Sequence, residues 1–230
     1  MKHILAATAA LFLTATAATG QELVRWANVD RALVEADSFA FASNGQHFGV
    51  QVVRLVRTDG GLHFEESTTL PMMSQTTTVL ISDALAMRSV RQRGQAQGRA
   101  MMIEVDYGAE RATGRALTPS AADTLAIDAA IGAGTIDDNV LLSLVPAIDW
   151  TESTDVVVPV FHSGRNTTAE MRLHVTGTES VTVPAGTFDT FRVETTGDSP
   201  LVLFVERAAP HRLVRVQIVG APVEMVRLNG

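Results

Sequence analysis

Short hydrophobic or alternating runs, separated by turn residues, dominate the chain from about residue 38 onward. The stretches 172–176 and 214–218 alternate with a period of two, which predicts strands with one dry face and one wetter face. The runs 156–161 and 201–205 are hydrophobic on both sides and predict more deeply buried strands. The predicted strands are 38–43, 47–57, 62–67, 77–82, 99–107, 155–161, 171–176, 181–183, 188–194, 201–206, 213–219 and 223–228.

Turn residues connect these runs as hairpins. Asn44-Gly45 is a strong tight-turn dipeptide, and Asp59-Gly60-Gly61 turns the chain again, so the first three runs form a meander. Pro184-Ala185-Gly186 can join two further strands, with Gly186 free to adopt a positive φ. We expect a hairpin here whose hydrophobic face borders a groove.

The pattern changes between residues 118 and 147, where we expect a helical insert. Thr118-Pro119-Ser120 is a good helix start, and the alanine-rich run 121–131 follows it until Gly132. A second start at 135–138 precedes apolar residues on one helical face, and Pro146 ends that run. The segment 23–35 is expected to be a third helix.

The first 20 residues have the features of an export signal. A short positive start precedes an apolar run from Ile4 to Leu13, and small residues follow up to Gly20. Ten residues are too few for a membrane anchor, which needs about 20. We therefore expect a cleaved signal peptide at 1–20, a lead segment at 21–37, a single β domain at 38–230, no transmembrane anchor after cleavage, and a periplasmic or secreted location.

Charge argues against nucleic acid as a partner. The chain has a formal charge of −7, and losing Lys2, its only lysine, gives −8 (−7 less +1). An acidic surface repels phosphate backbones. The arginines at 88, 91, 93 and 99 are expected to lie on a solvated strand edge.

No motif for catalysis or for a metal is present. The chain has no cysteine, and no Gly-x-Ser-x-Gly elbow occurs. The histidines do not stand at zinc-site spacings, and Asp137-Asp138-Asn139 is better explained as a helix cap than as a set of oxygen ligands. We expect no catalytic residue, no metal and no cofactor. A hydrolase of unrecognised type is the weakest alternative, with His162-Ser163 and His211 as its candidates.

Several motifs of the second half together resemble a known family. They are GTIDDN at 134–139, LVPA at 144–147, VPVF at 158–161, the stretch 175–194 and APHRLVRV at 209–216. Over residues 40–228 the chain is similar to uncharacterised exported bacterial proteins of the DUF3108-like kind. The resemblance implies a mainly β (α+β) fold: one strongly curved antiparallel sheet, an open LolA/LolB-like half-barrel, with two or three short helices on its concave side. It implies no catalytic residue.

The leading functional hypothesis is a non-enzymatic periplasmic binding or carrier protein, whose groove takes a lipid, an acyl chain or a hydrophobic segment of a partner. The alternative is an envelope assembly or scaffold protein that contacts other proteins. The methionines add soft, adaptable apolar surface, although core filling explains any single one of them. The residues expected to line the groove are Met101, Ile103, Leu141, Leu144, Phe191 and Phe204.

Overall fold

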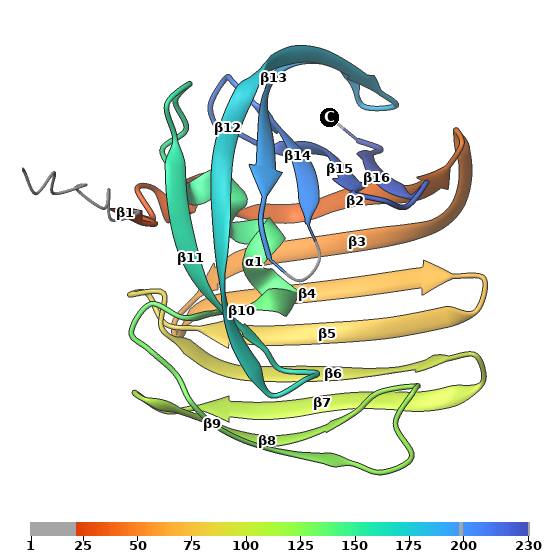
Figure 1. The fold of residues 1–230 in the computed structure, drawn as a ribbon, viewed down its shortest axis with the longest axis vertical. Helices are drawn as coiled ribbons and strands as arrows, with labels where there is room; N and C mark the ends of the chain where they lie inside the picture. Colours follow the sequence, from red (N-terminus) through yellow and green to blue (C-terminus); the bar gives the residue numbers. More distant parts are fainter. Residues whose placement is uncertain (1–21, 198–199, 230) are drawn as a thin grey trace, which may run out of the picture.

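The computed structural model describes residues 22–197 and 200–229, and within them the chain forms one large, open, curved sheet (Figure 1). The strands are β1 (Glu22–Leu23), β2 (Val34–Ser43), β3 (Gln46–Thr58), β4 (Gly61–Leu70), β5 (Met73–Ile81), β6 (Met87–Ala96), β7 (Arg99–Tyr107), β8 (Arg111–Leu117), β9 (Leu125–Ala130), β10 (Ile136–Asp137), β11 (Asp155–His162), β12 (Thr167–Val183), β13 (Gly186–Thr195), β14 (Leu201–Glu206), β15 (Leu213–Ile218) and β16 (Glu224–Arg227).

The order of the strands across the sheet is β1-β11-β12-β13-β14-β15-β16-β2-β3-β4-β5-β6-β7-β8-β9, and β10 also pairs with β11. Neighbouring strands are antiparallel except for the two short parallel pairings of β1 and β10 with β11. The pairing of β16 with β2 joins the two ends of the chain. The prediction of an open curved sheet is confirmed.

The only α-helix in the described residues is α1 (Asp138–Leu144), which lies inside the bend of the sheet (Figure 1). Asp137 is its N-cap, because the carboxylate accepts a hydrogen bond from the backbone N–H of Asn139 at 2.9 Å. Val140, Leu141 and Leu144 are buried on the face toward the sheet. A 3-10 turn, η2 (Val145–Ala147), continues the helix and contains Pro146. The predicted helix over this stretch is confirmed.

The alanine-rich run 121–131 is not a helix, so that prediction is wrong. Residues 125–130 form β9, which pairs with β8 and buries Ile127 in the core. The backbone hydrogen bonds offered by β8 outweigh the helix propensity of alanine, which differs from that of other residues by less than about 1 kcal/mol per residue. The segment 23–35 is also not an α-helix: it contains β1, the four-residue 3-10 turn η1 (Val29–Ala32) and the start of β2.

Besides β9 and the two-residue strands β1 and β10, the predicted set lacks β6 and β8, and two of the predicted strands are parts of one longer strand. β6 and β8 are rich in arginine, glutamine and glycine, and their inward positions are too small or too polar to give a hydrophobic alternation. The predicted strands 171–176 and 181–183 are parts of the single long strand β12, which bends at a bulge between Val175 and Gly177.

The hairpin at Pro184-Ala185-Gly186 is confirmed. Val183 pairs with Gly186, so Pro184 and Ala185 form a two-residue turn between β12 and β13. Gly186 has φ of +137°, a conformation that other residues adopt only with strain. The backbone N–H of Ala185 donates to the carbonyl oxygen of Arg227 at 3.2 Å, which ties the hairpin tip to β16.

We predict that Gly186→Ala lowers the free energy of unfolding by about 1–3 kcal/mol, because the β-carbon is strained at a positive φ. Urea unfolding of the purified protein measures the change. Ala185→Ser, in the same turn, serves as the control and is expected to change stability little. A Gly186→Ala protein as stable as the wild type would show that the turn relaxes without cost.

The core lies in two clusters on opposite faces of the sheet. The main cluster fills the bend and includes the buried face of α1. The second cluster packs the tip of the β12–β13 hairpin, through Val181 and Val183, against Val202, Phe204 and Val214. The long hairpin therefore folds back over the outer face of the neighbouring strands, as its curl at one end of the molecule shows (Figure 1).

Candidate functional site: the concave face

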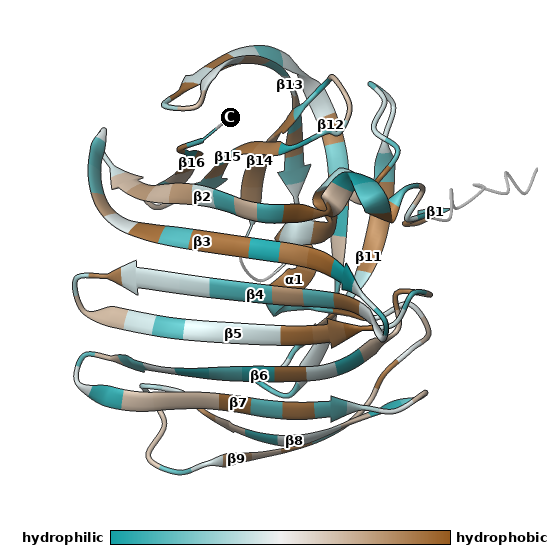
Figure 2. Ribbon diagram, turned by 180° about the vertical axis from the view of Figure 1, so that it is seen from behind, coloured by the Kyte–Doolittle hydropathy of each residue, from teal (hydrophilic) through white to brown (hydrophobic). Residues whose placement is uncertain are grey.

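The concave wall changes from hydrophobic to polar along β3 to β7. Directly paired residues form cross-strand rows, and the row nearest α1 consists of Leu55, Phe64, Val79, Val90 and Val105, all 0 % exposed. Figure 2 shows the same change along β5, which is hydrophobic at the end beside α1 and pale or hydrophilic elsewhere. The helix docks where the wall is dry, because that surface gains most from burial.

The row after the hydrophobic one is mixed, and the next is mostly polar. The mixed row contains Val53, Glu66, Thr77, Gln92 and Ile103. The polar row contains Gln51, Thr68, Gln75, Gly94 and Met101. These side chains share the concave face with the hydrophobic row because successive side chains of a strand point to opposite faces. The wall beside the helix is therefore able to form hydrogen bonds.

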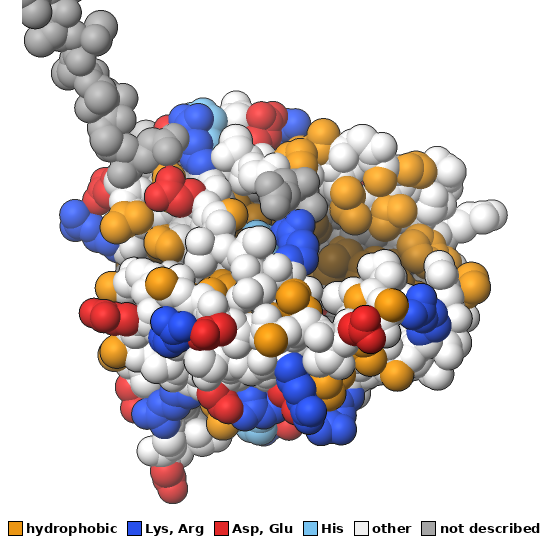
Figure 3. Space-filling model, turned by 60° about the horizontal axis from the view of Figure 1, so that its bottom comes forward, with side chains coloured by type: hydrophobic (Ala, Val, Ile, Leu, Met, Phe, Trp, Pro, Cys, Tyr) orange, Lys and Arg blue, Asp and Glu red, His pale blue; other side chains and the backbone are white. Residues whose placement is uncertain are grey.

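A pocket opens between α1, η1 and the wall formed by β2 and β3, and we call it the concave pocket. Its volume is about 520 Å³ including its open mouth. The pocket is lined by Arg31, Ala32, Leu33, Val34, Asp37, Phe39, Gln51, Val53, Leu142, Ser143, Pro146, Arg212, Leu213 and Met225. Figure 3 shows one side of the molecule hollowed, with hydrophobic side chains gathered around the hollow.

A buried ion pair lies in one wall of the concave pocket. Arg227 of β16 donates from Nε to Oδ1 of Asp37 at 3.1 Å, and the two side chains are 4 % and 10 % exposed. The same oxygen accepts the backbone N–H of Ser38 at 2.9 Å. Desolvation makes such a pair costly unless its geometry is good, so its two partners depend on each other. The pair neutralises the only carboxylate that lines the pocket.

Glu66 is a second carboxylate on the concave wall, and no cation pairs with it among the described residues. It accepts hydrogen bonds from Thr68 Oγ1 at 3.0 Å and from Gln75 Nε2 at 3.2 Å. Gln51 donates to Thr68 Oγ1 at 3.3 Å and also lines the concave pocket, so the polar row leads into it. Burial raises the pKa of Glu66 above its usual range, although these hydrogen bonds favour the charged form.

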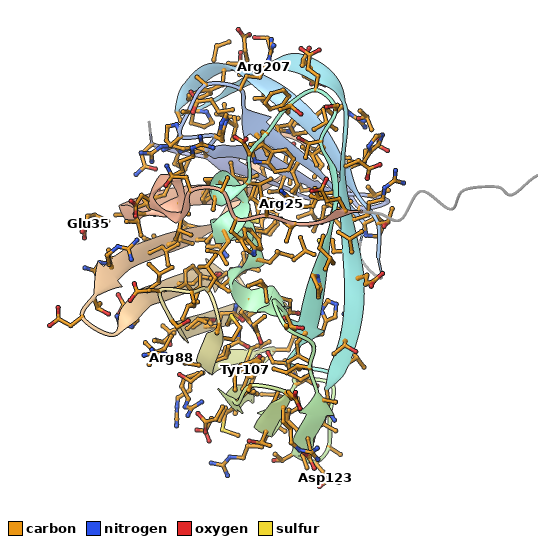
Figure 4. All side chains as sticks on the ribbon, turned by 90° about the vertical axis from the view of Figure 1, so that its left-hand side faces the viewer. Arg25, Glu35, Arg88, Tyr107, Asp123 and Arg207 are labelled. Atoms are coloured by element: carbon orange, nitrogen blue, oxygen red, sulfur yellow. The ribbon has the colours of Figure 1, made fainter. Side chains whose placement is uncertain are left out.

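A buried polar network holds the first turn of α1 against the sheet. Tyr107 of β7 donates its hydroxyl proton to Asp137, and Figure 4 shows Tyr107 inside the bend of the sheet, whereas Glu35, Arg88 and Asp123 lie at the surface. Asn139 Nδ2 donates to Asp137 at 2.7 Å, and Asn139 Oδ1 accepts from Gln92 at 3.0 Å. Desolvation, and next the charge of Asp138, raise the pKa of Asp137 to about 7.

The candidate hydrolase residues have separate partners. Ser163 is fully buried, and its hydroxyl oxygen accepts from Asn139 Nδ2 at 3.1 Å. The imidazole of His162 contacts Asp138 at 2.9 Å, at the first residue of α1. His211 Nδ1 lies 3.0 Å from the carbonyl oxygen of Glu206. His162 and Ser163 thus help to fix α1 on the sheet, a structural role that their sequence context does not indicate.

No group of three or more histidine, aspartate or glutamate side chains in the described residues is arranged to hold a metal ion. Asp137 and Asn139 instead have a structural role, because Asp137 is the N-cap of α1 and Asn139 donates a hydrogen bond to its carboxylate.

The six predicted groove residues do not form one groove. Ile103, Leu141, Leu144 and Phe191 belong to the main core cluster, where each is at most 7 % exposed. Met101 is half-buried in the polar row of the concave wall. Phe204 lies on the opposite face, in the second cluster, with the guanidinium of Arg215 5.4 Å from its ring centroid. None of the six lines the concave pocket.

The pocket residues that were missed come from five separate segments. Phe39, Val53, Leu142, Leu213 and Met225 supply most of its hydrophobic lining. Alternation indicates that Phe39 and Val53 share faces with other apolar residues of their strands, but it gives no sign that η1 and residue 213 lie opposite them. The pairing of β16 with β2 is the feature that assembles the pocket, and it joins residues about 190 positions apart.

The fold and the site define a protein built on an open, curved sheet that carries a pocket on its concave face. A family model described as "Protein of unknown function (DUF3108)" matches residues 24–221, and the chain belongs to this family. The family resemblance predicted from the motifs is thereby confirmed.

Other comparisons add little. No curated protein matches the chain. One solved structure, described as a candidate lipoprotein from Parabacteroides distasonis ATCC 8503, is similar at 12 % identity and a TM-score of 0.31, with 91 % of this chain and 99 % of that chain covered. Within residues 22–197 and 200–229, no helix combines the length and hydrophobicity needed to cross a bilayer. The predicted signal peptide, 1–20, lies outside the described residues.

Proposed function

We propose that this protein is a non-enzymatic binding or carrier protein of the periplasm, and that its concave pocket takes a hydrophobic ligand. The ligand is a lipid, an acyl chain or an apolar segment of a partner. The amino-terminal pattern of residues 1–20 supports export, since it has the charge, length and small residues of a signal peptide.

The observation that carries the proposal is the lining of the concave pocket. Phe39 and Val53 come from the sheet, Leu142 and Pro146 from the helical segment, and Met225 from the last strand. The pocket opens to solvent, so a ligand can enter it from outside. Like small-molecule sites in general, it combines an apolar lining with a few polar groups, here Gln51, Ser143 and the two lining arginines.

Filling the pocket is expected to abolish binding. Ser143 lines the pocket from α1, so Ser143→Phe places a ring where the ligand would lie. We predict that this change weakens binding of the neutral fluorophore N-phenyl-1-naphthylamine at least about tenfold, equivalent to about 1.4 kcal/mol. Fluorescence titration measures the affinity.

The matched control is Thr76→Phe, which adds the same ring to an exposed position of β5. It should bind like the wild type, and circular dichroism should show both variants folded. Native mass spectrometry of the gently purified wild type gives a second readout. A wild-type protein that carries no co-purified lipid and binds neither the fluorophore nor added lipids would contradict the proposal.

A second candidate function, envelope assembly through protein contacts, is favoured by the edge of the sheet at β9. This strand pairs only with β8 in the described part of the chain, and Leu125 at its start is 41 % exposed. A free strand edge can accept an extended segment of another protein. A photo-crosslinker placed at Ala126 in cells should capture one defined partner protein if this function holds, and none if the pocket alone acts.

A further inference from the structure

The concave pocket has more positive than negative charge at its surface, although the whole protein is acidic. Three charged residues line it: Arg31, Arg212 and Asp37. Asp37 is already neutralised by Arg227, with 3.1 Å between Oδ1 and Nε. The two lining arginines are therefore the charges that an incoming ligand would meet.

The two arginines differ in whether their guanidinium groups already have an acceptor within the protein. Arg31 faces Asp149 at 3.4 Å, a long contact to a carboxylate that is 72 % exposed. Arg212 is half-buried, and no acceptor contacts its guanidinium among residues 22–197 and 200–229. The guanidinium group presents donors in a fork that matches a carboxylate, and such charge-assisted bonds strengthen when water is excluded.

We propose that the occupant of the concave pocket is a fatty acid, whose carboxylate pairs with Arg212 and Arg31 and whose chain lies against Phe39, Val53 and Met225. The inference rests on the proposed function and adds the chemistry of the headgroup. The site matches a single negative charge. Asp149 offsets part of the positive charge of Arg31, whereas no carboxylate in the described part of the chain offsets the charge of Arg212, so about one positive charge remains for the ligand.

The test compares three lipids with the same chain on the wild-type protein: oleate, its methyl ester and oleoyl lysophosphatidate. Each lipid displaces N-phenyl-1-naphthylamine in a competition titration below its critical micelle concentration. Oleate is expected to bind at least about tenfold more tightly than the ester, as the loss of a charge-assisted pair predicts. Equal affinity for oleate and its ester would overturn the proposal, and so would a clear preference for the phosphate.

Variants then assign the headgroup contact. Arg212→Gln should lower the affinity for oleate about tenfold and leave the affinity for the ester unchanged. Arg212→Lys should retain part of the affinity for oleate. Arg31→Gln should act in the same direction with a smaller effect. The control, Arg88→Gln, removes an exposed arginine that donates to the carbonyl oxygen of Gly60 at 2.6 Å, away from the pocket, and should change neither affinity.

The outcomes separate this inference from the proposed function. If Arg212→Gln lowers the affinities for oleate and for the ester equally, or lowers neither affinity, the assignment of the headgroup contact is wrong, but the proposal that the pocket binds a ligand still stands. If no lipid displaces the fluorophore and Ser143→Phe has no effect on its binding, the pocket is not a ligand site and both proposals fail.

Discussion

Replacing Arg227 by methionine is expected to lower the free energy of unfolding by about 3–5 kcal/mol, because the change leaves Asp37 charged and buried without its partner. The two side chains are 4 % and 10 % exposed, so water does not replace the lost contact. The pair also joins β16 to β2, the pairing that brings the two ends of the chain together. We therefore expect the loss to affect the whole cooperative transition, as measured by urea unfolding.

The double change Asp37→Leu with Arg227→Met removes both charges and should recover most of the lost stability. Arg54→Met is the control, because Arg54 pairs with Glu35 at 3.3 Å on the exposed surface and should contribute little. A single Arg227→Met change that costs less than about 1 kcal/mol would contradict this account of the pair, since breaking a buried pair normally costs several times as much.

The second large effect is a dependence of stability on pH that arises from Asp137. Its pKa is raised to about 7 in the folded protein, above the usual value of about 3.9 in an unfolded chain. Between these two values the folded state holds a proton that the unfolded state has lost. Stability should therefore be highest near pH 4 with respect to this group, fall as the pH rises to about 7, and level off above it.

The size of the decrease follows from the difference of about three pKa units, each equivalent to about 1.4 kcal/mol, so about 4 kcal/mol is the upper limit. The charged and polar groups around Asp137 are Asp138, which raises its pKa, and Tyr107 and Asn139, whose hydrogen bonds lower it. His162 lies against Asp138 and not against Asp137. Unfolding curves in urea between pH 4.5 and 8.5 measure the slope.

Asp137→Asn is the matched variant, because asparagine keeps the N-cap oxygen and imitates the protonated acid. Its stability should vary less with pH in this range and should exceed that of the wild type at pH 8. If the variant and the wild type show the same slope between pH 4.5 and 7, another group is responsible for the dependence. Asp137→Ala would remove the cap as well and should destabilise at every pH.

Most of the strands could be predicted from the sequence, because each carries its pattern locally. The run 99–107 was predicted with the bounds that the structure has, and α1 was predicted from the cap at 135–138 and the stop at Pro146. The alanine-rich segment failed for a physical reason: alanine fits either structure, and the open edge of β8 decides which forms.

The pocket could not be predicted in the same way. Its residues become neighbours through register, and register depends on pairings such as Arg227 with Phe39 that join distant parts of the chain. Leu141 and Leu144 do lie on the apolar face of a helix, but this face is buried against the sheet and is therefore not available to a ligand. The adjacent residues Leu142 and Ser143, on the less buried side, are the ones that meet the open space.

The pairing of β16 with β2 sets an order of events for the chain. Arg227 lies 190 positions after its ion-pair partner Asp37 in the chain, and it pairs with Phe39 across the two strands. Contacts between residues so far apart in sequence form slowly. The conformational entropy lost on closing a long loop must be overcome before these contacts contribute any stabilising free energy. Until β16 has paired with β2, the concave pocket lacks the part of its wall that Met225 supplies, so the pocket is complete only after this long-range pairing has formed.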